Sequence, residues 1–295
     1  MNKYFLLLAS AALIVTACQK ETPETVFNPE NDRANTTTTG VGPVPSTFTK
    51  KTIVEHFVST TNGDAPMSSW ALEQVVRANP NRVYSTELHW NDVMALNQTQ
   101  RLLTAMGVSA LTDPTGCVDR KSFGSQILIN SSQFSNAVSA NLTKPVDCGL
   151  AIRSTTANRA ANIFVHSGFT TNFSTPLNLT VYLVEDQVIS SKSAFAQTNN
   201  MNNVAGTPFT NMGNPINNYL HSQVVRRVLT SAFGNTLSTT TINAGSSIVS
   251  GFTVDIPEKI NPNSRWKVIA FITDAVTNEI LNVQQADLGT IKNWN

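Results

Sequence analysis

The most reactive side chains in this sequence are three thiols, on Cys18, Cys117 and Cys148. Thiol–disulfide exchange needs an attacking thiolate and a second sulfur that resolves the mixed disulfide. Proteins that carry out this exchange place both sulfurs where a strand runs into a helix, because the helix amides and dipole stabilise a thiolate there. The junction of that kind in this chain is Asn62-Gly63-Asp64-Ala65, which contains no cysteine. Dithiol catalysis at this loop is therefore excluded.

Cys18 has a different setting, because it follows an N-terminus typical of exported proteins. Lys3 supplies a positive charge, and Phe5–Val15 is an apolar stretch too short to span a bilayer. The stretch ends in Val15-Thr16-Ala17-Cys18, which resembles the lipobox of bacterial lipoproteins. We expect residues 1–17 to be removed and Cys18 to carry acyl chains that anchor the protein in membrane lipid. The alternative is an ordinary signal peptide with an incidental cysteine.

Cys117 and Cys148 remain once Cys18 is acylated, and they form a candidate disulfide. Outside the cytoplasm, two leftover cysteines favour a bridge over free thiols. A bridge that closes a loop of this length would contribute about 3–4 kcal/mol. The alternative is a pair of buried, unpaired cysteines, because a sequence separation gives no geometry.

No spacing in the sequence predicts a metal, a cofactor or a catalytic group. The histidines at positions 56, 89, 166 and 221 have no partner at i+4 and no HExxH motif. GxSxG, Walker, GxGxxG and EF-hand patterns are also missing from the sequence. A formal net charge of +1 gives no electrostatic reason to expect nucleic-acid binding. We therefore expect no metal, no cofactor and no nucleic-acid partner.

A strand and a helix hold the sulfur-free loop. Thr52–Val58 is apolar enough for a buried strand, and Asp64 and Pro66 suit the N-cap and first turn of a helix. An inward stripe at helical spacing follows, made of Leu72, Val75 and Val76. Asn79-Pro80-Asn81 then ends the helix.

Strands and helices continue to alternate up to about residue 143. Arg82–Leu88 is predicted as a strand, and Gln98–Met106 and Ser131–Leu142 are predicted as helices. Alternation of this kind predicts an α/β domain.

After Lys144-Pro145 the hydrophobic period changes to two. Apolar and polar residues alternate over Leu177–Leu183, and Trp266–Ile272 is nearly continuously apolar, as in a central strand. Ser190–Asn218 is predicted as a long surface loop, and Tyr219–Leu229 fits either a strand or a helix. Together these segments predict an all-β sandwich of immunoglobulin-like type.

Four segments of the chain follow from these patterns. We expect a signal peptide at 1–17, a lipidated N-terminus and tether at 18–46, an α/β domain at 47–143 and a β-sandwich domain at 144–295. The tether is polar and cannot form a core of its own. Gln19-Lys20-Glu21 resembles signals that send some lipoproteins to the outside of the outer membrane. We therefore expect a lipid-anchored outer-membrane protein that faces the cell surface and not the periplasm.

Three segments, EHFVSTTNGDAP, GVSALTDPTGCVDR and WKVIAFITDAVTNEILNV, follow one another in an order that resembles a known family. This family comprises Bacteroidetes outer-membrane lipoproteins related to a Porphyromonas outer-membrane antigen, and the resemblance covers roughly residues 48–290. It implies a thioredoxin-like α/β domain followed by the β-sandwich. Many relatives carry Cys-Gly-x-Cys-Pro where this chain has Asn62-Gly63-Asp64-Ala65-Pro66. Asp113-Pro114-Thr115 falls where thioredoxin-like folds keep a cis-proline.

The resemblance brings no defined activity, although the family is linked to adhesion or surface binding. We expect a non-catalytic, lipid-anchored outer-membrane protein that binds a protein, peptide or glycan. Asp113-Pro114-Thr115 would offer a groove to which an extended ligand adds as a strand. One alternative is a residual thiol–disulfide oxidoreductase that uses Cys117. Another is a structural subunit of an outer-membrane assembly.

Overall fold

The structure is a computed structural model that describes residues 40–238 and 240–294. The signal peptide, Cys18 and most of the tether lie outside the described residues. None of the helices within the described ranges is long and apolar enough to cross a membrane. The elements are β1 (Thr52–Val58), α2 (Ala65–Ala78), β2 (Val83–His89), α3 (Asn97–Ala105), β3 (Thr115–Val118), α4 (Phe134–Leu142), β4 (Cys148–Ala157), β5 (Ala160–Phe169), β6 (Leu177–Asp186), β7 (Val224–Val228), β8 (Asn235–Thr236), β9 (Ser247–Asp255), β10 (Arg265–Asp274), β11 (Ile280–Asp287) and β12 (Ile291–Lys292).

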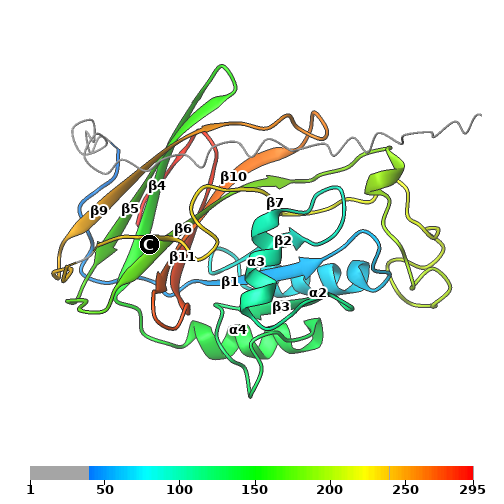
Figure 1. Cartoon of the computed structure of the whole chain (residues 1–295), viewed down its shortest axis with the longest axis horizontal. Helices are drawn as coiled ribbons and strands as arrows, with labels where there is room; N and C mark the ends of the chain where they lie inside the picture. Colours follow the sequence, from blue (N-terminus) through cyan, green and yellow to red (C-terminus); the bar gives the residue numbers. More distant parts are fainter. Residues whose placement is uncertain (1–39, 239, 295) are drawn as a thin grey trace, which may run out of the picture.

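The strands form two sheets (Figure 1). The larger sheet has the order β11-β10-β6-β7-β2-β1-β3, with β8 paired to β6, and the smaller sheet has the order β12-β4-β5-β9. In the larger sheet β1 and β2 are parallel, as are β2 and β7, and the other pairs are antiparallel. The larger sheet therefore continues without a break from the N-terminal strands to the C-terminal ones.

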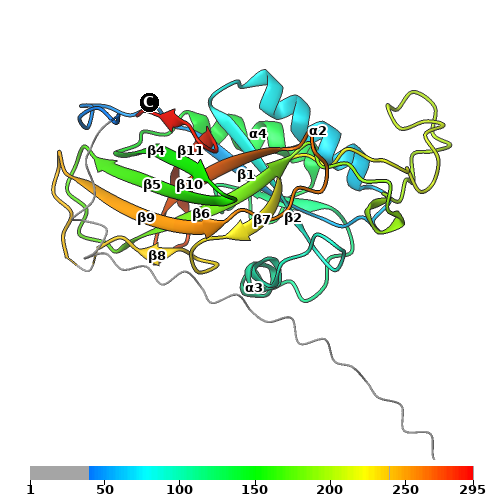
Figure 2. The ribbon, with the colours of Figure 1, turned by 90° about the horizontal axis from the view of Figure 1, so that it is seen from above.

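The helices cover the β3-β1-β2 end of the larger sheet on both faces (Figure 2). Val54 of β1 packs in one cluster with Leu72 of α2 and Phe134 of α4. Its neighbour Ile53 packs in a different cluster with Leu102 of α3. Successive residues of a strand point to opposite faces, so one apolar strand can hold helices on both sides of the sheet.

The largest core lies between the two sheets. Val181 of β6 and Val268 of β10 face it from the larger sheet, and Ile152 of β4 and Ile163 of β5 face it from the smaller one. All four side chains are fully buried. Each contributes about 1.5–3 kcal/mol to folding relative to an exposed side chain.

The prediction of a separate thioredoxin-like α/β domain followed by an immunoglobulin-like sandwich domain is wrong. The protein is mostly β-sheet, and the strands expected to form the α/β domain are part of the same sheet as β6, β10 and β11. The junction is the parallel pair β2–β7, where Glu87 lies opposite Val224. Hydrophobic periods identify strands and helices, but they carry no information about which distant strands pair. The segment boundaries at 46/47 and 143/144 stay predictions.

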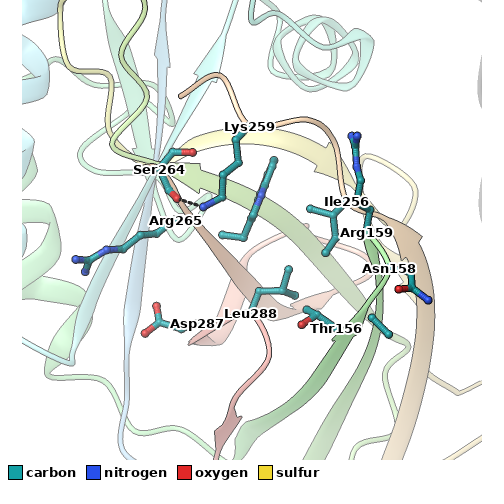
Figure 3. A pocket seen from close by; sticks show the side chains of 11 residues that line it. Thr156, Asn158, Arg159, Ile256, Lys259, Ser264, Arg265, Asp287 and Leu288 are labelled. Atoms are coloured by element: carbon teal, nitrogen blue, oxygen red, sulfur yellow. Dashed lines mark hydrogen bonds between the residues drawn. The ribbon is translucent and has the colours of Figure 1, made fainter. Parts of the chain in front are cut away.

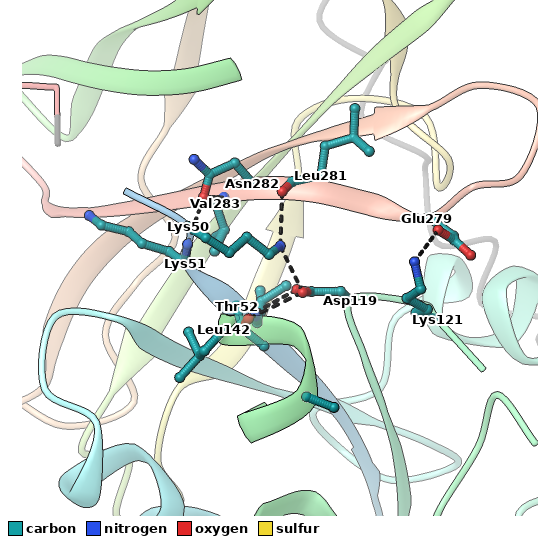
Figure 4. Close-up of polar contacts among 12 residues, drawn as sticks. Lys50, Lys51, Thr52, Asp119, Lys121, Leu142, Glu279, Leu281, Asn282 and Val283 are labelled. Carbon is teal, nitrogen blue, oxygen red and sulfur yellow. Dashed lines mark hydrogen bonds and ion pairs between the residues drawn. The ribbon is translucent and has the colours of Figure 1, made fainter. Parts of the chain in front are cut away.

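Buried polar contacts also join the residues just before β1 to β11 (Figure 4). Lys50 Nζ forms an ion pair with Asp119 Oδ2 at 2.8 Å and donates to Leu281 O, also at 2.8 Å. Asn282 Oδ1 accepts from Lys51 N at 2.9 Å. Lys50 and Lys51 are buried, so their contacts with Leu281 and Asn282 satisfy polar groups that water does not reach and join the two halves of the chain.

Candidate functional site

The sulfur-free loop lies between β1 and α2, as the sequence predicts, but another segment covers it. This segment, residues 190–218, is called the covering loop below. Asn200 N donates to Gly63 O at 2.9 Å, and Asn200 Nδ2 donates to Asp64 Oδ1 at 3.0 Å. Asp64 occupies the N-cap of α2 but makes no side-chain cap bond, and Ala65 begins the helix and is buried. The loop is therefore closed by the chain itself.

Asp113-Pro114-Thr115 leads into β3, and its backbone surroundings are also occupied. Gly116 N donates to Ile129 O at 3.0 Å, and Ile129 N donates to Gly116 O at 2.8 Å. Pro114 does not follow a cis peptide bond, since in the described residues the cis bond is Asn214–Pro215. The predicted strand-addition groove therefore has no free backbone edge next to Gly116, because the segment around Ile129 occupies it.

Cys117 and Cys148 are free thiols, and the candidate disulfide is absent from the described residues. The two side chains belong to different cores. Cys148 packs between the two sheets, whereas Cys117 packs on the α3 face of the larger sheet. Burial raises the pKa of both thiols, and the neighbouring Glu55 carboxylate raises that of Cys117 further.

A pocket of about 680 Å³ opens at one end of the sandwich, beside the β4–β5 turn (Figure 3). We call it the sandwich-end pocket. Its large apolar lining residues are Ile256, Trp266 and Leu288, which are half-buried and pack against the core between the sheets. The pocket lies where β9 and β10 reach the end of this core.

The rim of the sandwich-end pocket is mainly cationic. Arg159, Lys259 and Arg265 line it and are exposed, against a single lining carboxylate on Asp287. Lys259 Nζ donates to Ser264 O at 2.5 Å, which holds this ammonium at the mouth (Figure 3). Arg159 lies in the β4–β5 turn with a positive φ of 64°. The pocket thus offers an apolar surface beneath a basic rim, a combination suited to an anionic ligand with an apolar face.

A second arrangement of reactive groups is buried where β2 meets β7. Glu87 and His89 lie on the same face of β2, and His221 precedes β7. One ligand-type atom from each of the three side chains lies within 4.8 Å of the others, and all three residues are buried. We call this group the Glu87–His89–His221 cluster. His56 of β1 is also buried, and its Nε2 lies 2.7 Å from Ser68 Oγ.

The environment of this cluster favours charge on Glu87 and His89. Burial alone would lower the pKa of His89, but its contacts with Asp92 and Glu87 raise that pKa to about 9. Burial would raise the pKa of Glu87, but its contact with the adjacent His89 lowers this pKa by more than burial raises it. Burial and the neighbouring His89 lower the pKa of His221.

Sequence reasoning missed both the sandwich-end pocket and the buried cluster. The pocket is lined from four separate segments, and Trp266 reads in sequence as part of a core strand. His89 and His221 are far apart in the chain, and neither has a second ligand at helical spacing. The residues of each site come together only when the strands pair, so no local sequence pattern marks either site.

The fold and the sites define a two-sheet protein with a covered sulfur-free loop and an open basic pocket. Residues 102–292 match the family described as outer membrane protein Omp28. This match spans more than half of the chain, so the chain belongs to the Omp28 family of outer-membrane proteins.

A solved structure has a similar fold. HBP35 of Porphyromonas gingivalis superposes with a TM-score of 0.62 at 18% sequence identity, over 82% of this chain and 76% of that chain. At this identity the likeness shows the fold alone. No curated protein matches the sequence. The family match and the solved structure confirm the predicted resemblance to outer-membrane proteins related to a Porphyromonas antigen.

Proposed function

We propose that this outer-membrane protein is a non-catalytic, lipid-anchored binding protein that captures an acidic carbohydrate at the cell surface. The observation that carries the proposal is the sandwich-end pocket, with Trp266 in its lining and Arg159 and Lys259 on its rim. Sugar rings present an apolar C–H face that packs on indole and aliphatic side chains. Carboxylate or sulfate groups on the ring edge pair with guanidinium and ammonium groups.

The geometry of the thiols and of the sulfur-free loop supports a non-catalytic role. Cys117 is fully buried, and its raised pKa keeps it as a thiol and not as the thiolate needed for attack. Its Sγ lies 3.7 Å from Glu55 Oε2. The 62–65 loop has no sulfur and is covered by Asn200. No group at the former redox position is therefore prepared for exchange chemistry.

Calorimetric titration of the full-length protein in detergent tests the proposed ligand class. A sulfated, uronic-acid-containing tetrasaccharide should bind, and a neutral tetrasaccharide should not. Arg159→Ala and Lys259→Ala should each weaken binding about tenfold, equivalent to about 1.4 kcal/mol. Arg101→Ala removes an exposed cation of α3, far from the pocket lining, and should leave the affinity unchanged. Equal binding of the neutral sugar, or an equal loss in Arg101→Ala, would contradict the proposal.

The anchor and the outward orientation need a separate test, because Cys18 lies outside the described residues. Mass spectrometry of the N-terminal peptide should find acyl chains on Cys18, and Cys18→Ser should release the protein from the membrane fraction. Protease treatment of intact cells should release peptides from residues 46–295. Protection of these peptides until the envelope is broken would place the protein on the periplasmic side and remove surface capture as its role.

A further inference from the structure

We propose that Glu87, His89 and His221 form a binding site for a divalent transition-metal ion, with Zn²⁺ as the ion that best fits the donor set. Two imidazole nitrogens and a carboxylate oxygen are a common zinc ligand set. The three ligand atoms lie within 4.8 Å of one another in the structure. A metal site here goes beyond carbohydrate capture and involves a different part of the molecule.

The first observation is an unpaired nitrogen on a buried histidine. His89 Nε2 has no hydrogen-bond partner within the described residues, although its side chain is only 1% exposed. It faces Glu87 Oε2 at 3.7 Å, which is too long for a hydrogen bond. Buried polar atoms nearly always have a partner. A metal ion that takes the place of the proton on His89 Nε2 would bind this nitrogen together with Glu87 Oε2.

The second observation is that each proposed ligand is already oriented by a further group. His89 Nδ1 lies 2.7 Å from Asp92 Oδ2, and Ser69 Oγ donates to Glu87 Oε1 at 2.6 Å. His221 Nε2 lies 3.0 Å from Phe195 O. In metal sites, the second nitrogen of a ligating histidine is held by a carboxylate or a carbonyl in this way.

These contacts determine which atoms remain for the ion. Asp92 uses Nδ1 of His89 and leaves Nε2, while Phe195 O uses Nε2 of His221 and leaves Nδ1. Ser69 uses Oε1 of Glu87 and leaves Oε2. One ligand atom of each residue is therefore not used by these contacts, and a water molecule would complete the four positions of a tetrahedral zinc ion.

Small movements bring these atoms to ligand distances. Tetrahedral zinc with bonds of ~2.1 Å separates its ligand atoms by about 3.4 Å. The 3.7 Å between His89 Nε2 and Glu87 Oε2 is already close to that value. The ligand atoms of all three residues lie within 4.8 Å of one another, at most about 1.4 Å beyond that separation.

An ion at this site would link two parts of the larger sheet. Glu87 and His89 come from β2, and His221 comes from the segment that leads into β7. These two strands join the N-terminal and C-terminal parts of the larger sheet. His221 also reaches Phe195, in the covering loop, so the ion would fasten that loop as well.

Metal titration of chelator-stripped, full-length protein in detergent tests the site. We expect one Zn²⁺ per chain by calorimetry and by elemental analysis, and a Co²⁺ absorption spectrum typical of four ligands. Zn²⁺ should raise the Tm of the wild type, whereas Mg²⁺ and Ca²⁺ should not. His89→Gln and His221→Gln should each lose Zn²⁺ binding, and Asp92→Asn should weaken it about 10- to 100-fold.

His166→Gln is the matched control, because His166 is a buried histidine of β5 in the smaller sheet and should not affect zinc binding. Circular dichroism without metal shows whether each variant folds. If a variant of a ligand residue does not fold, the zinc affinity of Asp92→Asn still tests the site. Failure of the wild type to retain an ion would overturn the proposal. Equal zinc binding by the wild type, His89→Gln and His221→Gln would also overturn it. The cluster would then be a charged histidine–carboxylate group without a metal ion.

Discussion

Glu55 shows at the residue scale how a charge is held inside the larger sheet. It is fully buried on β1, and Arg120 contacts both of its oxygens, with Nε at 2.6 Å from Oε2 and Nη2 at 2.8 Å from Oε1. Tyr182 of β6 donates to Oε1 at 2.7 Å. Burial would raise the pKa of Glu55, but Arg120 and these hydrogen bonds lower it. The carboxylate therefore stays ionised and ties β1 to β6.

Loss of the arginine should destabilise the protein strongly. Arg120→Met leaves the buried Glu55 carboxylate without its cation, which costs about 3–5 kcal/mol for buried pairs of this kind. Denaturant unfolding followed by circular dichroism measures the change. Arg77→Ala removes an arginine from an exposed pair with Glu73 and should cost less than about 0.5 kcal/mol. A similar loss in both variants would show that the Glu55 network has no special role.

Lys51 is a buried lysine that should give the stability a pH dependence. Burial, and next the nearby charge of Lys292, lower its pKa to about 7. In the unfolded chain the ordinary value is about 10.4. Between these two values the unfolded chain binds a proton that the folded chain has released, so the free energy of unfolding rises with pH.

Unfolding measured between pH 7 and 9.5 in the wild type and in Lys51→Met tests this expectation. The wild-type free energy should rise relative to the variant by at most about 1.4 kcal/mol per pH unit. Measurements above pH 10 would also include the titration of Tyr84, whose pKa is raised to about 12 by burial. Parallel pH profiles for the two proteins would refute the assignment to Lys51.

At the scale of elements, the covering loop depends on the absence of a side chain at Gly63. A Cβ built there would lie 2.2 Å from Asn200 Oδ1, so Gly63→Ala should displace Asn200 from Asp64. Hydrogen exchange should then become faster at the amide of Asn200, which is bonded to Gly63 O. Gly42→Ala is the control, because nothing lies within 4 Å of a Cβ at that position.

A double variant separates this contact from a general loosening of the loop. In Gly63→Ala/Asn200→Ala the clash is removed, and the exchange rates of the neighbouring amides should return toward the wild-type values. Unchanged exchange in Gly63→Ala alone would show that Asn200 adapts without opening the loop.

Local patterns predicted the elements well where a short stretch determines them. The predicted strand Thr52–Val58 has the bounds of β1, and the helix after Asp64 ends at Ala78, as Asn79-Pro80-Asn81 indicates. The ambiguous segment 219–229 contains a strand, β7, in which Val225 and Val228 lie on either side of a register shift and pack against the same cluster, while Val224 packs in another. Such irregular pairing leaves no clear period in the sequence.

The sites could not be predicted from the sequence for a related reason. The 62–65 loop could be located from its strand and helix, but its cover by Asn200 is a contact between distant segments. His89 and His221 likewise meet only because β2 pairs with β7. Residue types indicate chemistry, and long-range pairing decides which of them come together.

On the scale of the whole molecule, the continuous sheet predicts that neither half of the chain folds alone. A fragment of residues 47–143 would leave the edge of β2 open, and a fragment of residues 144–295 would leave the edge of β7 open. Near-ultraviolet circular dichroism should show no fixed tertiary structure in either fragment, and mixing them should restore part of the signal. A cooperative thermal transition in the 47–143 fragment would contradict this expectation.

The parallel β2–β7 pair also sets the order in which the chain can fold during synthesis. Glu87 finds its partner Val224 only after the intervening residues have been made. At roughly 5–20 residues per second, the edge of β2 waits on the order of 10 s for it. An open strand edge is a template for aggregation, and pairing across such a separation is slow. The edge of β2 therefore stays open to unwanted pairing until β7 is available.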